Sequence, residues 1–175
     1  MADFEFRAWL LRLPLPARTR GRLIRRFGAR IGRNVRIHQI TVANPDWSNL
    51  SIGDDVYVGH DCIIDLTERV TLGRGSVLAA GVALVTHQDA GTSHASPTAL
   101  RLGTWARHLE VGPYAFIGTR AVLMADVGRD AVVGAGAVVV EPLPGGVTAV
   151  GVPARIVKGS VSLVSDPAMR SSEAL

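Results

Sequence analysis

The residues best suited to chemistry in this chain are its five histidines, and one of them stands apart by its position. Imidazole, with an ordinary pKa of about 6.5, can take a proton from a hydroxyl group at neutral pH. His87 comes at the end of a run of regular repeats and directly before a long segment without repeats. Such interruptions in compact proteins are usually functional or disordered. His87 is therefore a candidate general base, with a structural role as the alternative, and Asp89 is a candidate to orient either His87 or its acceptor.

The other histidines lack such a setting. His38, His60 and His108 lie at or near repeat corners without an obvious partner, and His94 lies inside the interrupting segment. A zinc site needs ligands such as three histidines at about 2.0–2.1 Å from the metal. His60, His87 and His94 could be combined in this way. Six residues separate His87 from His94, however, which is wider than expected for a ligand pair, so no metal is expected.

The repeats that must position these residues have a period of six, clearest between residues 111 and 142. An aliphatic residue opens nearly every block, Gly usually follows it, and a small residue comes four positions later, as in Val127, Gly128 and Ala131. A period of six is neither helical nor strand-like, and it is typical of a solenoid with flat sides and tight corners. We expect the aliphatic residues to point inward and the glycines to let the backbone turn.

Similar blocks occur upstream, so the solenoid covers most of the chain. Ile52 to Leu72 spans twenty residues, about one three-sided coil. Hydrogen-bonded coils rise roughly 4.8 Å each, so about five coils would give a prism near 24 Å tall. The predicted organisation is a helical cap over residues 1–30, a repeat domain over 31–158 interrupted by a loop at 88–108, and a flexible tail over 159–175.

Composition agrees with one domain built on a thin aliphatic core. Hydrophobic residues make up 47% of the 175 residues but aromatic residues only 5%, which suits a solenoid better than a wide core. The single Cys62 excludes an internal disulfide framework and is expected to be buried filler. No apolar run approaches the roughly 20 residues that span a bilayer, and no signal-peptide core is present. A cytoplasmic protein is therefore expected.

Positive charge is concentrated at the N-terminus. Residues 1–36 carry ten Arg against Asp3 and Glu5, a net charge of +8, and the remainder carries −4. Because the basic charge occupies one end only, a nucleic-acid partner is not expected. Short helices are predicted over residues 4–13 and 18–28, the second capped by Gly28. This segment has two interpretations: a cap over the first coil, and a peripheral membrane contact between arginines and anionic headgroups.

The repeat blocks and the segment Thr86-His87-Gln88-Asp89 together resemble the hexapeptide-repeat O-acetyltransferases. The resemblance covers about residues 20–158 and is closest to the colanic-acid-biosynthesis subgroup, whose order of parts appears here as FGARIGRNVRI, ANPDWSNLSIGDDVYVG and the THQD segment. Galactoside and maltose acetyltransferases share the core. The resemblance implies an all-β, left-handed parallel β-helix with a short N-terminal helical segment. It also implies a homotrimer that binds acetyl-CoA between two prisms, with the loop after His87 reaching over a neighbour.

The resemblance further implies which residues bind acetyl-CoA. In the family, a Trp precedes the pair Ile-Gly and a small residue follows it. Phe116 and Thr119 occupy these two positions here, and Ala135 would offer backbone hydrogen bonds to the cofactor. Arg155 and Lys158, in and after Gly-Val-Pro-Ala-Arg, would meet the CoA phosphates. Guanidinium and ammonium groups suit that role because they bind phosphate by charge-assisted hydrogen bonds.

Three departures from the family's pattern bear on the ligands. Glu141 stands where the family often has a Lys that contacts the cofactor, and it would repel a phosphate. The corner at 123–126 is two residues shorter than usual, from which we expect a local distortion. Galactoside acetyltransferases bind their acceptor through an acid and an amide, which align near Thr67 and Gly59 here. Neither Thr67 nor Gly59 can replace the side chain that the family has at that position.

Asp61 and Asp65 lie nearby and are the candidates for contact with a sugar hydroxyl. The predicted function is that of an acetyl-CoA-dependent O-acetyltransferase acting on a sugar or glycosylated acceptor. Transfer from a thioester to a hydroxyl needs a base, which would be His87. Three alternatives stay open: an N-acyltransferase acting on an amino sugar, a carbonic-anhydrase-like hexapeptide protein that holds a metal, and a non-catalytic assembly scaffold.

Overall fold

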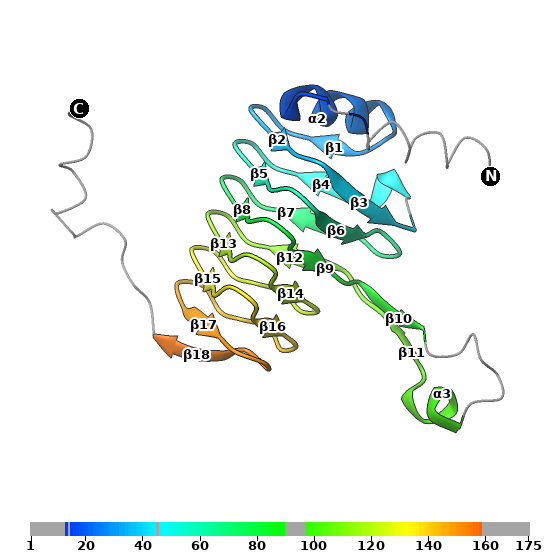
Figure 1. Cartoon of the computed structure of the whole chain (residues 1–175), viewed down its shortest axis with the longest axis vertical. Coiled ribbons are helices and arrows are strands. Elements are labelled where there is room, and N and C mark those ends of the chain that lie inside the picture. The colour runs from blue at the N-terminus through cyan, green and yellow to red at the C-terminus, as the bar shows by residue number, and fades with distance from the viewer. Residues whose placement is uncertain (1–12, 14, 45, 90–96, 159–175) are drawn as a thin grey trace, which may run out of the picture.

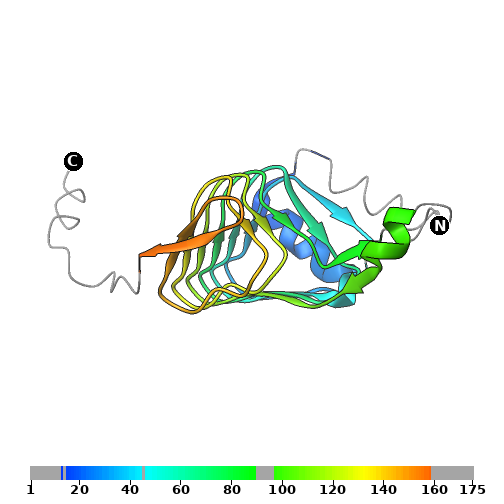
Figure 2. The ribbon, with the colours of Figure 1, turned by 90° about the horizontal axis from the view of Figure 1, so that it is seen from below.

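The computed structural model describes residues 13, 15–44, 46–89 and 97–158, which form a left-handed parallel β-helix (Figure 1). The chain visits three sheets in turn, so that the stack has a three-sided outline when it is viewed from below (Figure 2). The predicted helix over residues 4–13 and the predicted tail over 159–175 lie outside the described residues, except for Leu13.

Each side of the prism is one sheet. The four-stranded sheet has the order β1 (Arg30–Ile31), β4 (Leu50–Ile52), β7 (Val70–Leu72), β12 (Leu109–Val111). The seven-stranded sheet has the order β18 (Arg155–Lys158), β17 (Thr148–Val150), β15 (Val132–Val133), β13 (Phe116–Ile117), β8 (Val77–Leu78), β5 (Tyr57–Val58), β2 (Arg36–Ile37). The five-stranded sheet has the order β16 (Val138–Val139), β14 (Val122–Leu123), β9 (Ala83–Leu84), β6 (Cys62–Asp65), β3 (Ile40–Ala43). Five strands in this last sheet mean five complete coils, as predicted.

Aliphatic columns inside the prism explain why the period of six produces this fold. Parallel pairing places Ile64 beside Leu84, Leu84 beside Leu123, and Leu123 beside Val139. Equivalent columns line the other two sides, and nearly all of their members are buried. After β12 one coil takes only sixteen residues, and the four-stranded sheet continues as single bridges from Val111 to Val127 and from Val127 to Leu143. The change follows the short corner at 123–126.

The glycine after each aliphatic residue is needed for a different reason from the one predicted. A Cβ on Gly112 would lie 2.5 Å from the backbone nitrogen of Arg129 in the next coil, closer than real Cβ contacts allow. Its φ is not positive; the positive φ falls two residues later, on Tyr114 and on Asp130 in the next coil. Close stacking of the coils therefore requires the glycines, and the turn itself uses their neighbours.

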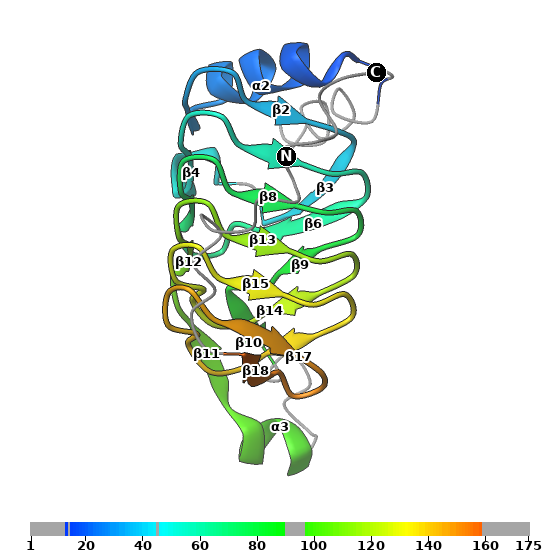
Figure 3. The same ribbon diagram turned by 90° about the vertical axis from the view of Figure 1, so that its left-hand side faces the viewer.

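Helix α2 (Ala17–Arg26) covers the first coil and matches the helix predicted over 18–28 (Figures 1 and 3). The helix ends as predicted at Gly28, where the Gly28 N–H donates to Arg25 and the Ala29 N–H to Ile24 in a Schellman pattern. Trp47, in the short 3-10 helix η1 (Trp47–Asn49), is buried against Phe27 with 5.4 Å between ring centroids. No helix in the described ranges is long and apolar enough to cross a membrane.

The interruption after the third coil forms an arm. Strands β10 (His87–Asp89) and β11 (Thr104–Ala106) pair in antiparallel fashion, and helix α3 (Pro97–Leu102) lies beyond them. The arm projects away from the prism toward the C-terminal coils (Figures 1 and 3). His87 opens β10, so it stands where the arm leaves the body.

Candidate active site

Polar residues from three successive coils meet at one corner of the prism, between the five-stranded and four-stranded sheets. Asn44 follows β3, Asp65 ends β6, and Thr86 and His87 follow β9. Because β3, β6 and β9 are adjacent and parallel, the residues that end them stack above one another. Asn44 Nδ2 donates to Thr67 Oγ1 at 2.8 Å and lies 3.4 Å from Asp65 Oδ1.

Asp65 is the centre of this corner, and its side chain is 7% exposed. Oδ2 accepts hydrogen bonds from the Thr86 N–H at 3.0 Å, the Thr86 hydroxyl at 2.8 Å and the His87 N–H at 3.1 Å. Oδ1 accepts from the Thr67 N–H at 3.1 Å and the Thr67 hydroxyl at 2.8 Å. The carboxylate is therefore held rigidly by backbone and hydroxyl donors.

The same carboxylate positions the imidazole of His87. Nδ1 of His87 lies 2.5 Å from Asp65 Oδ2 and 3.0 Å from Thr67 Oγ1. Because an ionised carboxylate only accepts hydrogen bonds, Nδ1 must carry the hydrogen, which leaves the Nε2 lone pair available. The His87 side chain is 31% exposed, so the ring is supported on one side and open to solvent on another.

Asp65 stays ionised in this setting. Burial alone would raise its pKa, but hydrogen bonds from His87, Thr67 and Thr86 outweigh burial and hold the pKa of the carboxyl well below its usual range. A fixed negative charge therefore faces Nδ1 of His87, and it would stabilise the imidazolium that forms when Nε2 accepts a proton.

The sequence-predicted residues around His87 are arranged differently from expectation. The orienting contact to the ring comes from Asp65, which was predicted to contact a sugar, whereas Asp89 lies two residues along β10 opposite Thr104. Asp61 precedes β6 and is exposed at the other end of that strand. Asn44 and Thr67 were not predicted as site residues. Their spacing of about one coil from Asp65 and His87 was the available signal.

The residues expected to bind acetyl-CoA gather on a different edge. Thr119 follows β13 and Ala135 follows β15, so both lie at the corner between the seven-stranded and five-stranded sheets. The Gly136 N–H donates to the Thr119 carbonyl at 2.8 Å, which places the two corners one above the other. Phe116 is 45% exposed on β13, Arg155 is exposed on β18, and Lys158 ends β18.

This edge can bind a ligand rich in acceptors. Thr119 and Ala135 are exposed, and their backbone N–H groups make no hydrogen bond within the described part of the chain. Two such donors one coil apart suit the amide carbonyls of a pantetheine arm, with the Arg155 cation available on β18. Glu141 follows β16 and therefore lies on the edge of His87, not on this one.

The described residues contain no cluster that would support the alternative of a metal site formed by three histidines. Groups of three or more His, Cys, Asp or Glu that could hold a metal are absent among those residues, and His94 lies outside them. His60 instead lies against His38 with 4.2 Å between ring centroids, on the corner between the seven-stranded and five-stranded sheets. His38 and His60 thus partner each other, which the sequence had not indicated.

Comparison with known proteins agrees with this architecture. The family model described as the hexapeptide repeat of succinyl-transferase matches residues 49–85 and 110–141, the two segments that flank the arm. An Escherichia coli (strain K12) protein assigned to colanic acid biosynthesis as the acetyltransferase WcaF is 32% identical over 150 residues. That match covers 82% of this chain and 76% of the relative.

Solved structures share the fold. A maltose O-acetyltransferase from Clostridium difficile 630 superposes with a TM-score of 0.69 at 21% identity, over 90% of this chain and 84% of that one. The hexapeptide-repeat acetyltransferase VCA0836 of Vibrio cholerae O1 biovar eltor, complexed with acetyl coenzyme A, gives 0.75 at 17% identity, over 90% and 85%. With the repeats, the fold and the extended match to WcaF in agreement, this chain belongs to the hexapeptide-repeat acetyltransferase family.

Proposed function

We propose that this protein transfers the acetyl group of acetyl-CoA to a hydroxyl of a sugar or glycosylated acceptor, with His87 as the general base. The observation that carries the proposal is the 2.5 Å contact between Asp65 and His87 at the root of the arm. Membership of the family supports an acetyl donor, and the relatives named for maltose and for colanic acid biosynthesis favour a sugar hydroxyl as acceptor.

The chain's own groups can perform the proton transfers. Nε2 of His87 accepts the proton of the acceptor hydroxyl, while the Asp65 charge stabilises the imidazolium. The same imidazolium can then return the proton to the departing thiolate. Acetyl-CoA supplies the acetyl group as a thioester. Asp65 is thus a positioning residue, and this role replaces the sugar contact expected from the sequence.

The proposed donor residues support the other half of the site. The free N–H groups of Thr119 and Ala135 would bind the pantetheine arm, Phe116 would form an apolar wall, and Arg155 and Lys158 would meet the phosphates. Asp61, on the same prism edge but in an earlier coil, stays a candidate for contact with the acceptor.

Two edges of one prism carry the two halves, which favours a site completed by a second copy. His87 lies at the corner that follows the five-stranded sheet, and Ala135 at the corner that precedes it. Exposed apolar side chains on β13 and β18, with Phe116 45%, Ile156 50% and Val157 62% exposed, offer a surface for self-association. A homotrimer with its acyl-transfer sites between prisms is the assembly that we propose.

The proposal is tested by measuring CoA release from acetyl-CoA with a panel of sugars and sugar nucleotides. Wild type, His87→Ala and the control His38→Ala would be compared, with acetyl-CoA binding measured separately by calorimetry. We expect turnover with at least one hydroxyl acceptor, a loss of about a hundredfold or more in His87→Ala, and unchanged acetyl-CoA binding. Wild-type activity retained by His87→Ala would exclude the base role, and failure to bind acetyl-CoA would exclude the donor.

A further inference from the structure

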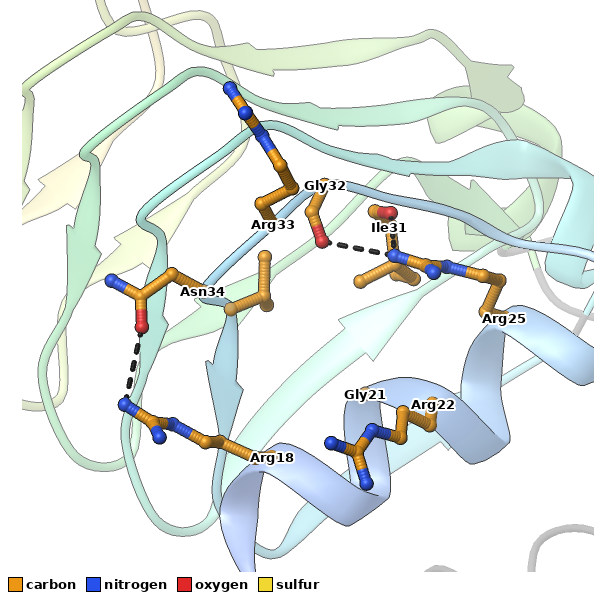
Figure 4. A pocket seen from close by; sticks show the side chains of 9 residues that line it. Arg18, Gly21, Arg22, Arg25, Ile31, Gly32, Arg33 and Asn34 are labelled. Atoms are coloured by element: carbon orange, nitrogen blue, oxygen red, sulfur yellow. Dashed lines mark hydrogen bonds between the residues drawn. The ribbon is translucent and has the colours of Figure 1, made fainter.

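A groove lies between α2 and the first corner of the prism (Figure 4). Its volume is about 270 Å³, well above the roughly 10–15 Å³ of such space that one water needs. Gly21, Ile31 and Val35 contribute small or apolar surface to it. The remaining lining residues are polar or basic: Arg18, Arg22, Arg25, Gly32, Arg33 and Asn34.

Three of these arginines form one stripe. Arg18, Arg22 and Arg25 are separated by four and three residues, so they lie along one flank of α2, next to the buried face that carries Arg20 and Ile24. No Asp or Glu occurs between residues 16 and 36, so nothing on the helix or the adjoining strand offsets this charge. Like charges placed this close repel one another unless an anion lies between them.

The stripe keeps most of its hydrogen-bonding capacity. Arg22 is exposed and makes no hydrogen bond or ion pair with any described residue. Among the described residues, Arg18 reaches only Asn34 Oδ1, at 3.4 Å. Arg25 donates through Nη2 to the carbonyls of Ile31 and Gly32, the latter at 3.0 Å. Each guanidinium offers five N–H donors, so several remain for a ligand with many acceptors.

The two carboxylates of the adjoining corner, Asp54 and Asp55, do not neutralise these three arginines. Asp54 is paired with Arg33 at 2.8 Å, and the Arg33 side chain extends away from the helix (Figure 4). Asp55 accepts from Asn34 Nδ2 at 3.0 Å and lies 3.5 Å from Arg74 in the next coil. The two acids are thus engaged on the coil side of the groove, and the helix side stays cationic.

We propose that this groove binds a phosphate group, presented by an anionic lipid headgroup or by a soluble phosphate ester. Phosphate matches the site because arginine forks bind its oxygens by charge-assisted hydrogen bonds, and no apolar or cationic ligand would satisfy three guanidinium groups. Helix α2 covers the N-terminal end of the stack (Figure 1), and Arg18, Arg22 and Arg25 are exposed, so a membrane headgroup can reach them. The groove adjoins the corner between the four-stranded and seven-stranded sheets, which is neither the edge of His87 nor that of Ala135.

The test uses the full chain and two kinds of probe. Calorimetry with inorganic pyrophosphate measures the soluble source. Co-sedimentation with phosphatidylcholine vesicles, with and without phosphatidylglycerol, measures the headgroup source. The variant Arg22→Gln removes an arginine of the groove that makes no hydrogen bond with the residues the structure describes. Arg26→Gln removes the same charge from the same helix outside the groove. Melting temperatures of both variants establish that they are folded.

We expect at least one probe to bind wild type, Arg22→Gln to weaken that binding about tenfold, and Arg26→Gln to weaken it less than about twofold. Binding of pyrophosphate alone would identify a soluble phosphate ester as the ligand, and binding of phosphatidylglycerol vesicles alone a membrane headgroup. Equal losses in the two variants would show general surface charge and overturn the proposal. So would the absence of binding to both probes. Neither result depends on acetyl transfer.

Discussion

At His87, the choice of which ring nitrogen carries the hydrogen is made by Asp65. Nδ1 faces a carboxylate that already accepts hydrogen bonds from Thr86 and Thr67, so the carboxylate cannot turn away without leaving buried donors unpaired. The ring is therefore held in one tautomer, with Nε2 toward the exposed side. A base held in this way does not have to reorganise during the reaction.

Asp65→Asn keeps the size of the side chain but removes the charge and makes one end of it a donor. We expect kcat to fall about a hundredfold or more, with little change in the KM for the acceptor, because the imidazolium loses its partner while the binding surface stays. Steady-state kinetics would measure this, with Asp130→Asn as the control, because Asp130 is exposed at a corner outside both proposed halves of the site. A change confined to KM in Asp65→Asn would instead support the sugar contact predicted from the sequence.

The depressed pKa of Asp65 also predicts a pH dependence of stability. A carboxyl whose pKa is lower when folded stabilises the native state above its unfolded pKa, about 3.9, and that contribution is lost as the pH falls toward the folded pKa. The wild type should therefore be more stable than Asp65→Asn at pH 6. The difference should shrink as the pH falls below about 4. Urea unfolding at a series of pH values measures it, and a difference independent of pH would contradict the assignment.

The hydroxyl of Ser76 is a polar group buried in the apolar core. Ser76 occupies the buried small-residue position of the third coil, and its hydroxyl has no hydrogen-bond partner among the described residues. The equivalent positions in the next two coils hold Ala115 and Ala131. Ser76→Ala should therefore raise the free energy of unfolding by about 1 kcal/mol, or the melting temperature by roughly 2–4 °C. A lower melting temperature would mean that the hydroxyl is satisfied by a buried water.

At the level of elements, the distance between coils decides which glycines can be replaced. A Cβ on Gly112 would lie 2.5 Å from Arg129 N and 2.7 Å from Gly128 C, both backbone atoms of the next coil. A Cβ on Gly136 meets nothing within 4 Å, although its φ of +67° strains any other residue. Gly112→Ala should therefore cost well over 3 kcal/mol and Gly136→Ala about 1 kcal/mol, measured by thermal unfolding. Similar losses would contradict the stacking argument.

The same comparison shows how far the sequence could predict these elements. The aliphatic columns follow from the period of six, because every block places its inward residue at the same point of a coil. The need for Gly112, which lets the next coil approach closely, could not be predicted from the period of six. Contact between coils depends on the register in which their strands pair, and the period alone does not give that register. The bond from Asp65 to His87 was missed for the same reason: the residues are twenty-two apart and adjacent only once β6 pairs with β9. Helix α2 was predictable because its stripe and its Gly28 cap are local.

At the scale of the whole molecule, the active site proposed here is divided. One prism carries His87 at one corner and Ala135 at another, with the five-stranded sheet between them. The arm that begins at His87 leaves its own prism instead of folding back onto it (Figure 1). If each site combines the His87 edge of one copy with the donor edge of the next, two inactive variants should complement one another.

His87→Ala removes the base, and Ala135→Trp fills the exposed corner proposed for the donor, so each variant alone should be inactive. If the protein is the trimer proposed above, equal co-expression gives mixed trimers in which some interfaces take His87 from one variant and the intact Ala135 corner from the other. Random assembly would restore roughly a quarter of wild-type activity. The variant that carries both His87→Ala and Ala135→Trp, co-expressed with wild type, is the control for subunit exchange and for the level of expression. Activity that stays absent in mixed trimers, verified by light scattering and differential tags, would place both halves within a single chain and require the arm to close onto its own prism.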